Sequence, residues 1–302
     1  MSVLIVGSVA RDEVQVPWSS KTHAVLGGSA TYAALAARLW GPASIVAVVG
    51  SDFPKSYRKL FDKKRIDVQG LMEAPGRTFY WKGRYNEDLQ PKTLRLDLGV
   101  FSSFKPKLPP GLVRRTRVAF LGNIHPALQW EVFRQLKRPK LTACDSRDDW
   151  IRSDRKHFLA LVKRMDILFL NDSEARLLTG DNNLVRSTRA LARWGPKVAI
   201  IKKGEHGLLM ATRQMFYALP AVPLHQVNDP TGAGDSFAGA CLGYLNTQPR
   251  LTWDRLCRAV QYGSVVASMS IETYGPGRLI QATRGEIGRR MKRFRTLVGA
   301  IG

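Results

Sequence analysis

The stretch with the clearest chemical content is NDPTGAGDSFAGACLGYL, residues 228–245. Pro230 prevents a helix from continuing through it, and Gly232 and Gly234 permit backbone angles that other residues avoid. From Asp235 onwards the side chains are small and apolar, as in a packed helix. The glycine turn therefore presents backbone N–H groups at a helix N-terminus, where phosphate oxygens bind readily.

Asp235 lies at the same point as these amides. A carboxylate there is badly placed to bind phosphate but well placed to accept a proton beside it. The combination indicates phosphoryl transfer to a hydroxyl group, with the amides of Gly232, Ala233 and Gly234 stabilising the developing charge. A glycine turn that Asp235 only caps is the structural alternative, and the residues alone do not decide between the two.

Other chemical classes lack their motifs in this sequence. GxxxxGK[ST] occurs nowhere, which excludes a P-loop protein, and no GxGxxG opens a strand–helix unit. The three cysteines are scattered, so they indicate neither a disulfide framework nor a zinc site and are typical of the reducing cytoplasm. No apolar run approaches the ~18 residues of a membrane span, and the first residues are typical of a buried strand.

The net charge of +23, from 47 Lys and Arg against 24 Asp and Glu, is the abnormal number. Such a field attracts anions, including nucleotides, phosphorylated metabolites and nucleic acids. The basic clusters are dispersed and do not alternate with aromatic residues, so the sequence favours a solvated basic surface over nucleic-acid binding.

Strand and helix patterns alternate along most of the chain, which predicts an α/β fold with a mostly parallel sheet and crossover helices. The apolar runs of the expected core strands are 3–6, 44–49, 118–123, 141–145, 167–171 and 198–204. TFYWKGRY (78–85) and LRLDL (94–98) differ, because polar and apolar residues alternate there. That period of two predicts a small sheet with one wet face, standing apart from the main sheet.

DPTGAGDSFAGA (229–240) is similar to the C-terminal signature of the PfkB family of carbohydrate kinases. Four further segments resemble family elements and occur in family order. They are Gly27-Gly28 before a small-residue helix, residues 48–71, NDSEARLLTG (171–180) and KKGEHG (202–207). The resemblance implies one ribokinase-like α/β/α domain over residues 1–302, with a small β lid at about 10–26 and 72–100.

The resemblance also assigns roles to individual residues. Asp235 corresponds to the catalytic base, and Gly232, Ala233 and Gly234 correspond to the anion hole. Asp12, Gly27 and Gly28 match the positions that contact sugar hydroxyls. The positions assigned to ATP are Asn171, Glu174, Lys202, Gly204, Gly207, Thr231 and Ser264.

Magnesium is implied through Glu174, because Mg²⁺ bound with substrate phosphates needs few protein ligands. Asn171 with Glu174 three residues later is equally the pattern of a helix capping box. Some family members bind a monovalent cation such as K⁺ at the positions of Asp229 and Thr231, so Asp229 is a second candidate metal ligand.

This chain departs from the family pattern where the acceptor is recognised. Tyr32 stands where the family often has an asparagine that touches the sugar, and His125 stands near the place of a carboxylate. Ser264 replaces the Asn or His that lines adenine in relatives. Arg84 and Asn86 of the lid are further candidates for substrate contact. The identity of the acceptor is therefore not carried over.

The leading hypothesis is an ATP- and Mg²⁺-dependent kinase that phosphorylates a hydroxymethyl group of a sugar or sugar-like molecule in the cytoplasm. A nucleoside kinase of the same fold is the alternative, because Tyr32 and the lid residues Phe79, Tyr80 and Trp81 could stack on a base. A non-catalytic scaffold or nucleic-acid-associated protein is a third hypothesis. A homodimer through exposed lid edges is compatible with all three.

Overall fold

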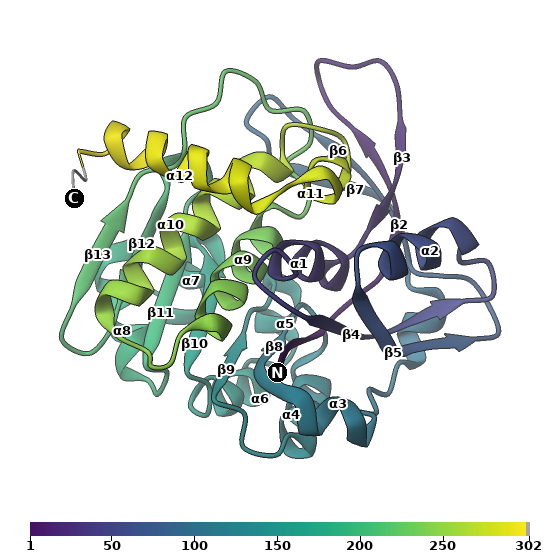
Figure 1. Cartoon of the computed structure of the whole chain (residues 1–302), viewed down its shortest axis with the longest axis horizontal. Helices are drawn as coiled ribbons and strands as arrows, with labels where there is room; N and C mark the ends of the chain where they lie inside the picture. Colours follow the sequence, from purple (N-terminus) through teal and green to yellow (C-terminus); the bar gives the residue numbers. More distant parts are fainter. Residues whose placement is uncertain (300–302) are drawn as a thin grey trace.

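A nine-stranded sheet forms the centre of the computed structural model, which describes residues 1–299 (Figure 1). Its strands are β1 Ser2–Val6, β4 Ala43–Gly50, β5 Ile66–Ala74, β8 Thr116–Leu121, β9 Leu141–Cys144, β10 Ile167–Asn171, β11 Val198–Lys202, β12 Leu208–Ala211 and β13 Phe216–Leu219. The strand order is β13-β12-β11-β10-β9-β8-β1-β4-β5. From β11 to β5 neighbouring strands are parallel, whereas β12 and β13 are added antiparallel at one edge.

Helices cover both faces of this sheet, which completes the predicted three layers. One layer consists of α1 Ser29–Ala37, α2 Lys55–Lys63, α9 Ala233–Thr247, α10 Trp253–Ser270, α11 Gly277–Gln281 and α12 Arg284–Leu297. The other consists of α3 Pro110–Arg115, α4 Pro126–Gln135, α5 Asp148–Ser153, α6 Arg155–Val162, α7 Asp172–Thr179 and α8 Leu184–Arg193. Alternate residues of β1 serve the two layers, with Val3 and Ile5 on one core and Leu4 and Val6 on the other. Within residues 1–299, no helix combines the length and apolar character needed to cross a membrane.

A second, four-stranded sheet stands apart from the main one and is called the lid here (Figure 1). Its strands are β2 Ala10–Gln15, β3 His23–Gly27, β6 Tyr80–Tyr85 and β7 Pro91–Asp97. Their order is β3-β2-β6-β7, with β2 and β6 parallel and the other pairs antiparallel. The predicted lid segment 72–100 starts too early, because residues 72–74 continue β5 in the main sheet as far as its pairing with Gly50.

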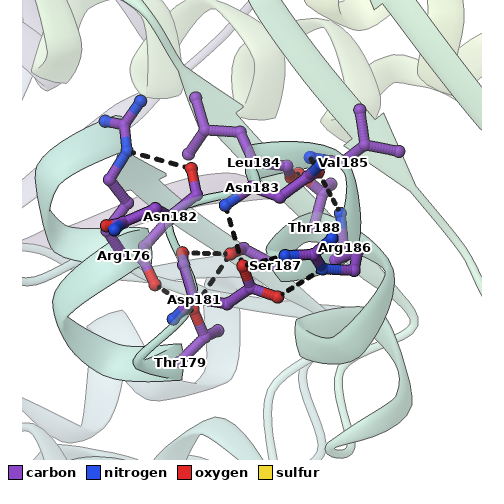
Figure 2. Close-up of polar contacts among 11 residues, drawn as sticks. Arg176, Thr179, Asp181, Asn182, Asn183, Leu184, Val185, Arg186, Ser187 and Thr188 are labelled. Atoms are coloured by element: carbon purple, nitrogen blue, oxygen red, sulfur yellow. Dashed lines mark hydrogen bonds and ion pairs between the residues drawn. The ribbon is translucent and has the colours of Figure 1, made fainter.

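The turn between α7 and α8 is held by a carboxylate (Figure 2). Asp181 accepts hydrogen bonds from Nε and Nη2 of Arg186 at 2.7 and 2.8 Å and from the amide of Asn183 at 2.8 Å. These bonds, with that of Arg186 the largest cause, lower the pKa of Asp181 to about 2. The carboxylate is therefore ionised over the whole neutral range, and its bonds hold the turn that follows α7, whose start carries Glu174.

Two glycines of α9 allow this helix to lie against α1 with backbones almost in contact. A Cβ on Gly239 would lie 2.2 Å from the carbonyl oxygen of Ala33, and one on Gly243 would lie 2.7 Å from that of Ala37. Because the obstacle is backbone, no side chain can move aside. The small residues thus bring the N-termini of α1 and α9 to the same end of the sheet.

We predict that Gly239→Ala lowers the free energy of unfolding by about 1–3 kcal/mol, the usual cost of overpacking. Gly288→Ala is the matched control, since Gly288 lies in α12 and a Cβ there would meet nothing within 4 Å. The control is expected to stabilise the protein by about 0.5–1 kcal/mol through helix propensity. Chemical denaturation of both variants measures the difference, and equal stability of the two would contradict the packing argument.

Candidate active site

The carboxyl ends of the parallel strands and the N-termini of α1 and α9 meet at one edge of the main sheet. The chain leaves β9 into Asp145, β10 ends at Asn171 and β11 ends at Lys202. Helix α9 begins at the Gly232–Asp235 turn. Open α/β sheets place their ligand sites at this edge, which makes the side chains gathered there the candidates for an active site.

Asp12 projects from the inner face of the lid into this edge. It is only 6% exposed, and its carboxyl group lies so close to Gly27 that a Cβ there would be 1.8 Å from Oδ2. Gly28 has a positive φ of 94° and its backbone donates a hydrogen bond to the carboxylate. Burial, followed by repulsion from Asp229, raises the pKa of Asp12 to about 8. The predicted grouping of Asp12, Gly27 and Gly28 is therefore present as one corner.

The glycine turn has the geometry of an anion site. Gly232 adopts a left-handed conformation with φ 74° and is followed directly by α9. Ala233 donates a long bond of 3.3 Å to Pro230, whereas within residues 1–299 the amides of Gly232 and Gly234 have no intramolecular acceptor. The Nζ of Lys202 lies 2.9 Å from the position that a Cβ on Gly234 would occupy. A cation and free amides thus converge on the same small volume.

Asp235 opens the first turn of α9 beside this volume and is partly exposed. Desolvation raises the pKa of its carboxyl group to about 6, while the positive charge of Lys202 and the amide of Asp235 itself oppose that rise. A group with such a pKa is mostly ionised at neutral pH yet still basic enough to accept a proton. The position and the pKa both suit a general base.

Asn171 and Glu174 form the capping box that the sequence left open as an alternative. The amide of Asn171 donates to Oε2 of Glu174 at 2.7 Å, and the amide of Glu174 donates to Oδ1 of Asn171 at 2.8 Å. The capping role does not remove Glu174 from the site, since burial raises its pKa to about 7 and Lys202 opposes that rise. The same residue therefore fixes the start of α7 and faces the lysine.

Asp145 joins this group and was not predicted. Its side chain is 4% exposed, and Oδ1 is buried without a hydrogen-bond partner. Burial raises its pKa, Lys202 lowers it, and Asp235 and Glu174 raise it further. The available signal was its place directly after the buried strand LTAC, because a carboxylate at the carboxyl end of a parallel strand lies in the ligand crevice.

Tyr32 and Tyr85 close the site from two sides. The ring of Tyr32 lies against Gly232, where a Cβ would be 2.3 Å from the ring, and its hydroxyl is buried without a partner. Tyr85 reaches down from the lid and its hydroxyl lies 2.9 Å from Oγ1 of Thr231. Tyr85 was missed by the sequence reasoning, which selected its neighbours.

Asp229 serves as a backbone clamp. Its Oδ1 accepts from the amide of Thr231 at 2.9 Å and its Oδ2 accepts from the amide of Gly275 at 2.8 Å. Both oxygens of this predicted metal ligand are thus engaged by backbone groups. Within residues 1–299, no three His, Cys, Asp or Glu side chains are arranged to hold a metal ion.

Arg84, Asn86 and His125 lie outside this cluster. Arg84 points to the outer face of the lid and donates to Gln15 at 2.9 Å, while Oδ1 of Asn86 accepts the amide of Gln90 within a hairpin loop. His125 caps α4 through the amide of Ala127 and packs on Trp150. Arg84 and Asn86 line a cavity of about 460 Å³ together with Gln15 and Tyr85. Substrate contact by Arg84, Asn86 and His125 stays a prediction.

Three further predicted nucleotide contacts are Gly204, Gly207 and Ser264. Gly204 and Gly207 have positive φ values of 55° and 80° and form the turn between β11 and β12. A Cβ on Gly204 would meet nothing within 4 Å, whereas one on Gly207 would lie 2.0 Å from the carbonyl oxygen of Leu219. Gly204 therefore borders open space, and Gly207 is required by packing. Ser264 is half-buried on α10.

Comparisons with known proteins agree with this geometry. The sequence profile described as pfkB family carbohydrate kinase matches residues 114–283. The chain belongs to this family. A cytidine kinase of Thermococcus kodakarensis is 28% identical over 255 residues, which cover 82% of this chain and 90% of that protein. A nucleoside kinase of Methanothermobacter thermautotrophicus is 27% identical over 274 residues, covering 89% and 84%.

Solved structures give the fold independently. The nucleoside kinase of Burkholderia thailandensis, solved with inosine, superposes with a TM-score of 0.81 at 22% identity and covers 98% of both chains. This superposition confirms the predicted ribokinase-like fold. The family match and the kinase relatives confirm the predicted enzyme class, a phosphotransferase with an alcohol group as acceptor. Membership of the pfkB family also argues against the hypothesis of a non-catalytic scaffold.

The buried Asp12 carboxyl group gives this kinase a testable pH dependence. Its pKa of about 8 in the folded protein exceeds its ordinary value of 3.8, so the folded protein retains a proton that the unfolded chain releases. Stability of the ligand-free protein should therefore fall as the pH rises from about 4 to about 8. Asp12→Asn cannot ionise and should be more stable than the wild type at pH 8 by at least about 1.4 kcal/mol, the value of one pKa unit.

Denaturation of both proteins at pH 5 and pH 8 measures this difference, with exposed Asp88 of the lid replaced by Asn as the control. The control should follow the wild type at both pH values. The assigned ionisation would be contradicted if the wild type and Asp12→Asn differed in free energy of unfolding by the same amount at pH 5 and at pH 8.

Proposed function

We propose that the protein is an ATP-dependent kinase that transfers the γ-phosphate to the hydroxymethyl group of a nucleoside. The observation that carries this proposal is an aromatic face of the lid placed directly beside the buried carboxyl group of Asp12. A site with hydroxyl recognition and an adjoining aromatic surface suits a ribose joined to a base.

The aromatic face is built by the strand register. Trp81 pairs with Asp12 across the parallel strands β6 and β2, so both side chains point to the inner face. The indole lies flat over Gly83, where a Cβ would be 2.1 Å from Cζ2, and its Nε1 donates to Oγ1 of Thr93 at 3.1 Å. A glycine at position 83 thus gives the ring a fixed, stacking orientation.

Tyr32 and Tyr85 extend this face toward the glycine turn. Tyr32 is 1% exposed, and its unpartnered hydroxyl supplies a donor that a bound acceptor could satisfy. The other two aromatic residues expected to contact a base turn elsewhere. Phe79 stacks on Phe101, and the ring of Tyr80 faces outward beneath Arg95.

The names of the relatives support a nucleoside over a free sugar as the acceptor. The two relatives described above are a cytidine kinase and a nucleoside kinase, and the Burkholderia protein was solved with inosine. A free sugar is the second candidate, because the corner of Asp12, Gly27 and Gly28 could bind its hydroxyls without any base.

The chemistry follows from the charges at the edge of the sheet. Asp12 accepts hydrogen bonds from hydroxyl groups of the acceptor and so orients the reacting oxygen. Asp235 takes the proton of the hydroxymethyl group as its oxygen attacks the γ-phosphorus. The bond to the β–γ bridging oxygen breaks, and Lys202 with the free amides of Gly232 and Gly234 stabilises the transferring group. A general base of this kind contributes about 10²–10⁴-fold.

Magnesium fits the carboxylates on the other side of Lys202. Asp145 has a buried oxygen without a partner and Glu174 lies beside it, and carboxylate oxygens are the ligands that Mg²⁺ prefers. Bound there, the ion would neutralise charge on the ATP phosphates. The clamp made by Asp229 and Thr231 supports the K⁺ proposal less, since both Asp229 oxygens already accept backbone hydrogen bonds.

The proposal extends to partners and compartment. The exposed β7 edge with half-exposed Leu94 and Leu96 supports pairing with a second copy of the chain. Three unpaired cysteines support a reducing cytoplasm. Nucleic acid is not expected to be a substrate, because Tyr85 of the lid reaches over the site to Thr231.

A panel of acceptors tests the assignment with two matched variants. Trp81→Ala should raise KM for cytidine and inosine about 5- to 100-fold, the loss of ~1–3 kcal/mol of stacking. Tyr80→Ala, one residue away on the outer face, should leave KM unchanged. Phosphorylation of ribose should respond to neither variant. Turnover of sugars with no turnover of nucleosides would contradict the proposal. The protein would then be a kinase of a free sugar.

A further inference from the structure

A group of basic residues surrounds the connection between α9 and α10, at the edge where the parallel strands begin. Arg117 lies in β8 and donates through Nη2 to the carbonyl oxygen of Gln248 at 2.9 Å. Lys140 precedes β9, and its Nζ donates to the same oxygen. Arg255 of α10 donates to the carbonyl oxygen of Arg250 at 3.0 Å. Arg117, Lys140, Arg250 and Arg255 therefore gather around one short loop.

A cavity of about 280 Å³, called the basal pocket here, opens beside this loop. Its lining residues are Lys140, Leu141, Lys197, Leu245, Pro249, Arg250 and Leu251. The lining is thus amphipathic, because it combines three basic side chains with those of leucine and proline. The strands between it and the catalytic edge are four to six residues long, which separates the two sites by roughly 15–20 Å.

Within residues 1–299, no carboxylate is among the lining residues of the basal pocket. Lys197 of the lining pairs with Asp166 at 2.7 Å, and Asp166 also accepts from Thr142. In the part of the chain that the structure describes, Arg117, Lys140, Arg250 and Arg255 make no ion pair.

The crowding has measurable consequences for two of these residues. Partial burial, together with the guanidinium groups of Arg117 and Arg255, lowers the pKa of Lys140. The Nε of Arg117 is buried and has no hydrogen-bond acceptor among residues 1–299. An anion bound here would offset the repulsion on Lys140 and accept a hydrogen bond from the Nε of Arg117.

Capping of α9 explains part of this arrangement. A cation near the last carbonyl groups of a helix is stabilising, and Gln248 follows the last residue of α9. One cation is sufficient for that purpose, whereas here two donate to the same carbonyl oxygen and two more lie beside it. Lys140 and Arg250 of this group line a cavity rather than flat surface, which is the arrangement of a ligand site.

We propose that the basal pocket binds a phosphorylated small molecule, with the phosphate between Lys140 and Arg250 and the apolar part on Leu141 and Leu251. The hollow matches a phosphomonoester in size. A nucleic-acid backbone would need an extended basic groove instead. The products of a kinase of this family are phosphomonoesters, so this chemical class is present wherever the enzyme works.

Calorimetric titration of the full-length protein with phenyl phosphate at about 150 mM salt tests the pocket. Phenyl phosphate combines a phosphate with an apolar ring and carries no hydroxymethyl group to phosphorylate. Lys140→Gln with Arg250→Gln should weaken binding at least about tenfold and leave nucleoside phosphorylation unchanged. The matched control is Lys137→Gln with Arg138→Gln, which removes the same charge from exposed positions of the neighbouring loop and should change affinity less than twofold.

The single variant Arg250→Gln is the safeguard in case the double variant does not fold. It is expected to fold normally, because the Arg250 side chain is exposed and forms no hydrogen bond or ion pair in residues 1–299. It should weaken binding on its own. Equal weakening in the pocket and control variants, or no binding to the wild type, would overturn the proposal. Displacement of phenyl phosphate by sub-micromolar duplex DNA at the same salt would also overturn it, in favour of a nucleic-acid surface.

Discussion

Carboxyl groups crowded around a single ammonium are the constraint on which the active site depends. Asp145, Glu174 and Asp235 all lie within the field of Lys202, and Asp12 faces Asp235 from the lid. Burial raises the pKa of each carboxyl group above its ordinary value, because an ionised group loses its hydration there. The ligand-free site is therefore short of positive charge and of hydrogen-bond donors. Hydroxyl groups and a divalent cation supply both, so ligand binding and the ionisation that catalysis requires are linked.

The fold places these groups together through a few positions where only a small residue fits. Gly239 and Gly243 let α9 lie on α1, which brings the N-termini of both helices to the carboxyl ends of the strands. At that edge Gly232 accommodates the ring of Tyr32, and Gly27 accommodates the carboxyl group of Asp12. In the lid, the pleat of each strand points every second side chain toward the site. The same glycine positions therefore determine both the packing of the fold and the geometry of the active site.

The sequence predicted the site residues that lie in local motifs. It did not predict the residues whose place in the site depends on how the strands pair. Asp235 and its glycine turn lie in one continuous motif, and the capping box of Asn171 and Glu174 was visible as a spacing. Tyr85 was missed in favour of Arg84 because neighbours in a strand face opposite sides, and only the pairing of β6 with β2 decides which side is inner. Asp145 follows a strand without any motif, and its partners lie far away in the chain. Strands β12 and β13 were not predicted, because a short antiparallel hairpin at a sheet edge lacks a strong periodic pattern.

The pH dependence of kcat/KM for the wild type and for Asp235→Asn tests the central claim most directly. If burial and Lys202 together set the base, wild-type kcat/KM should rise tenfold per pH unit below about pH 6 and level off above it. Asp235→Asn should retain the melting temperature of the wild type, lose at least about 100-fold in turnover above pH 6, and lack the wild-type fall in activity at lower pH. Undiminished turnover of Asp235→Asn on an acceptor that the wild type phosphorylates would contradict the account.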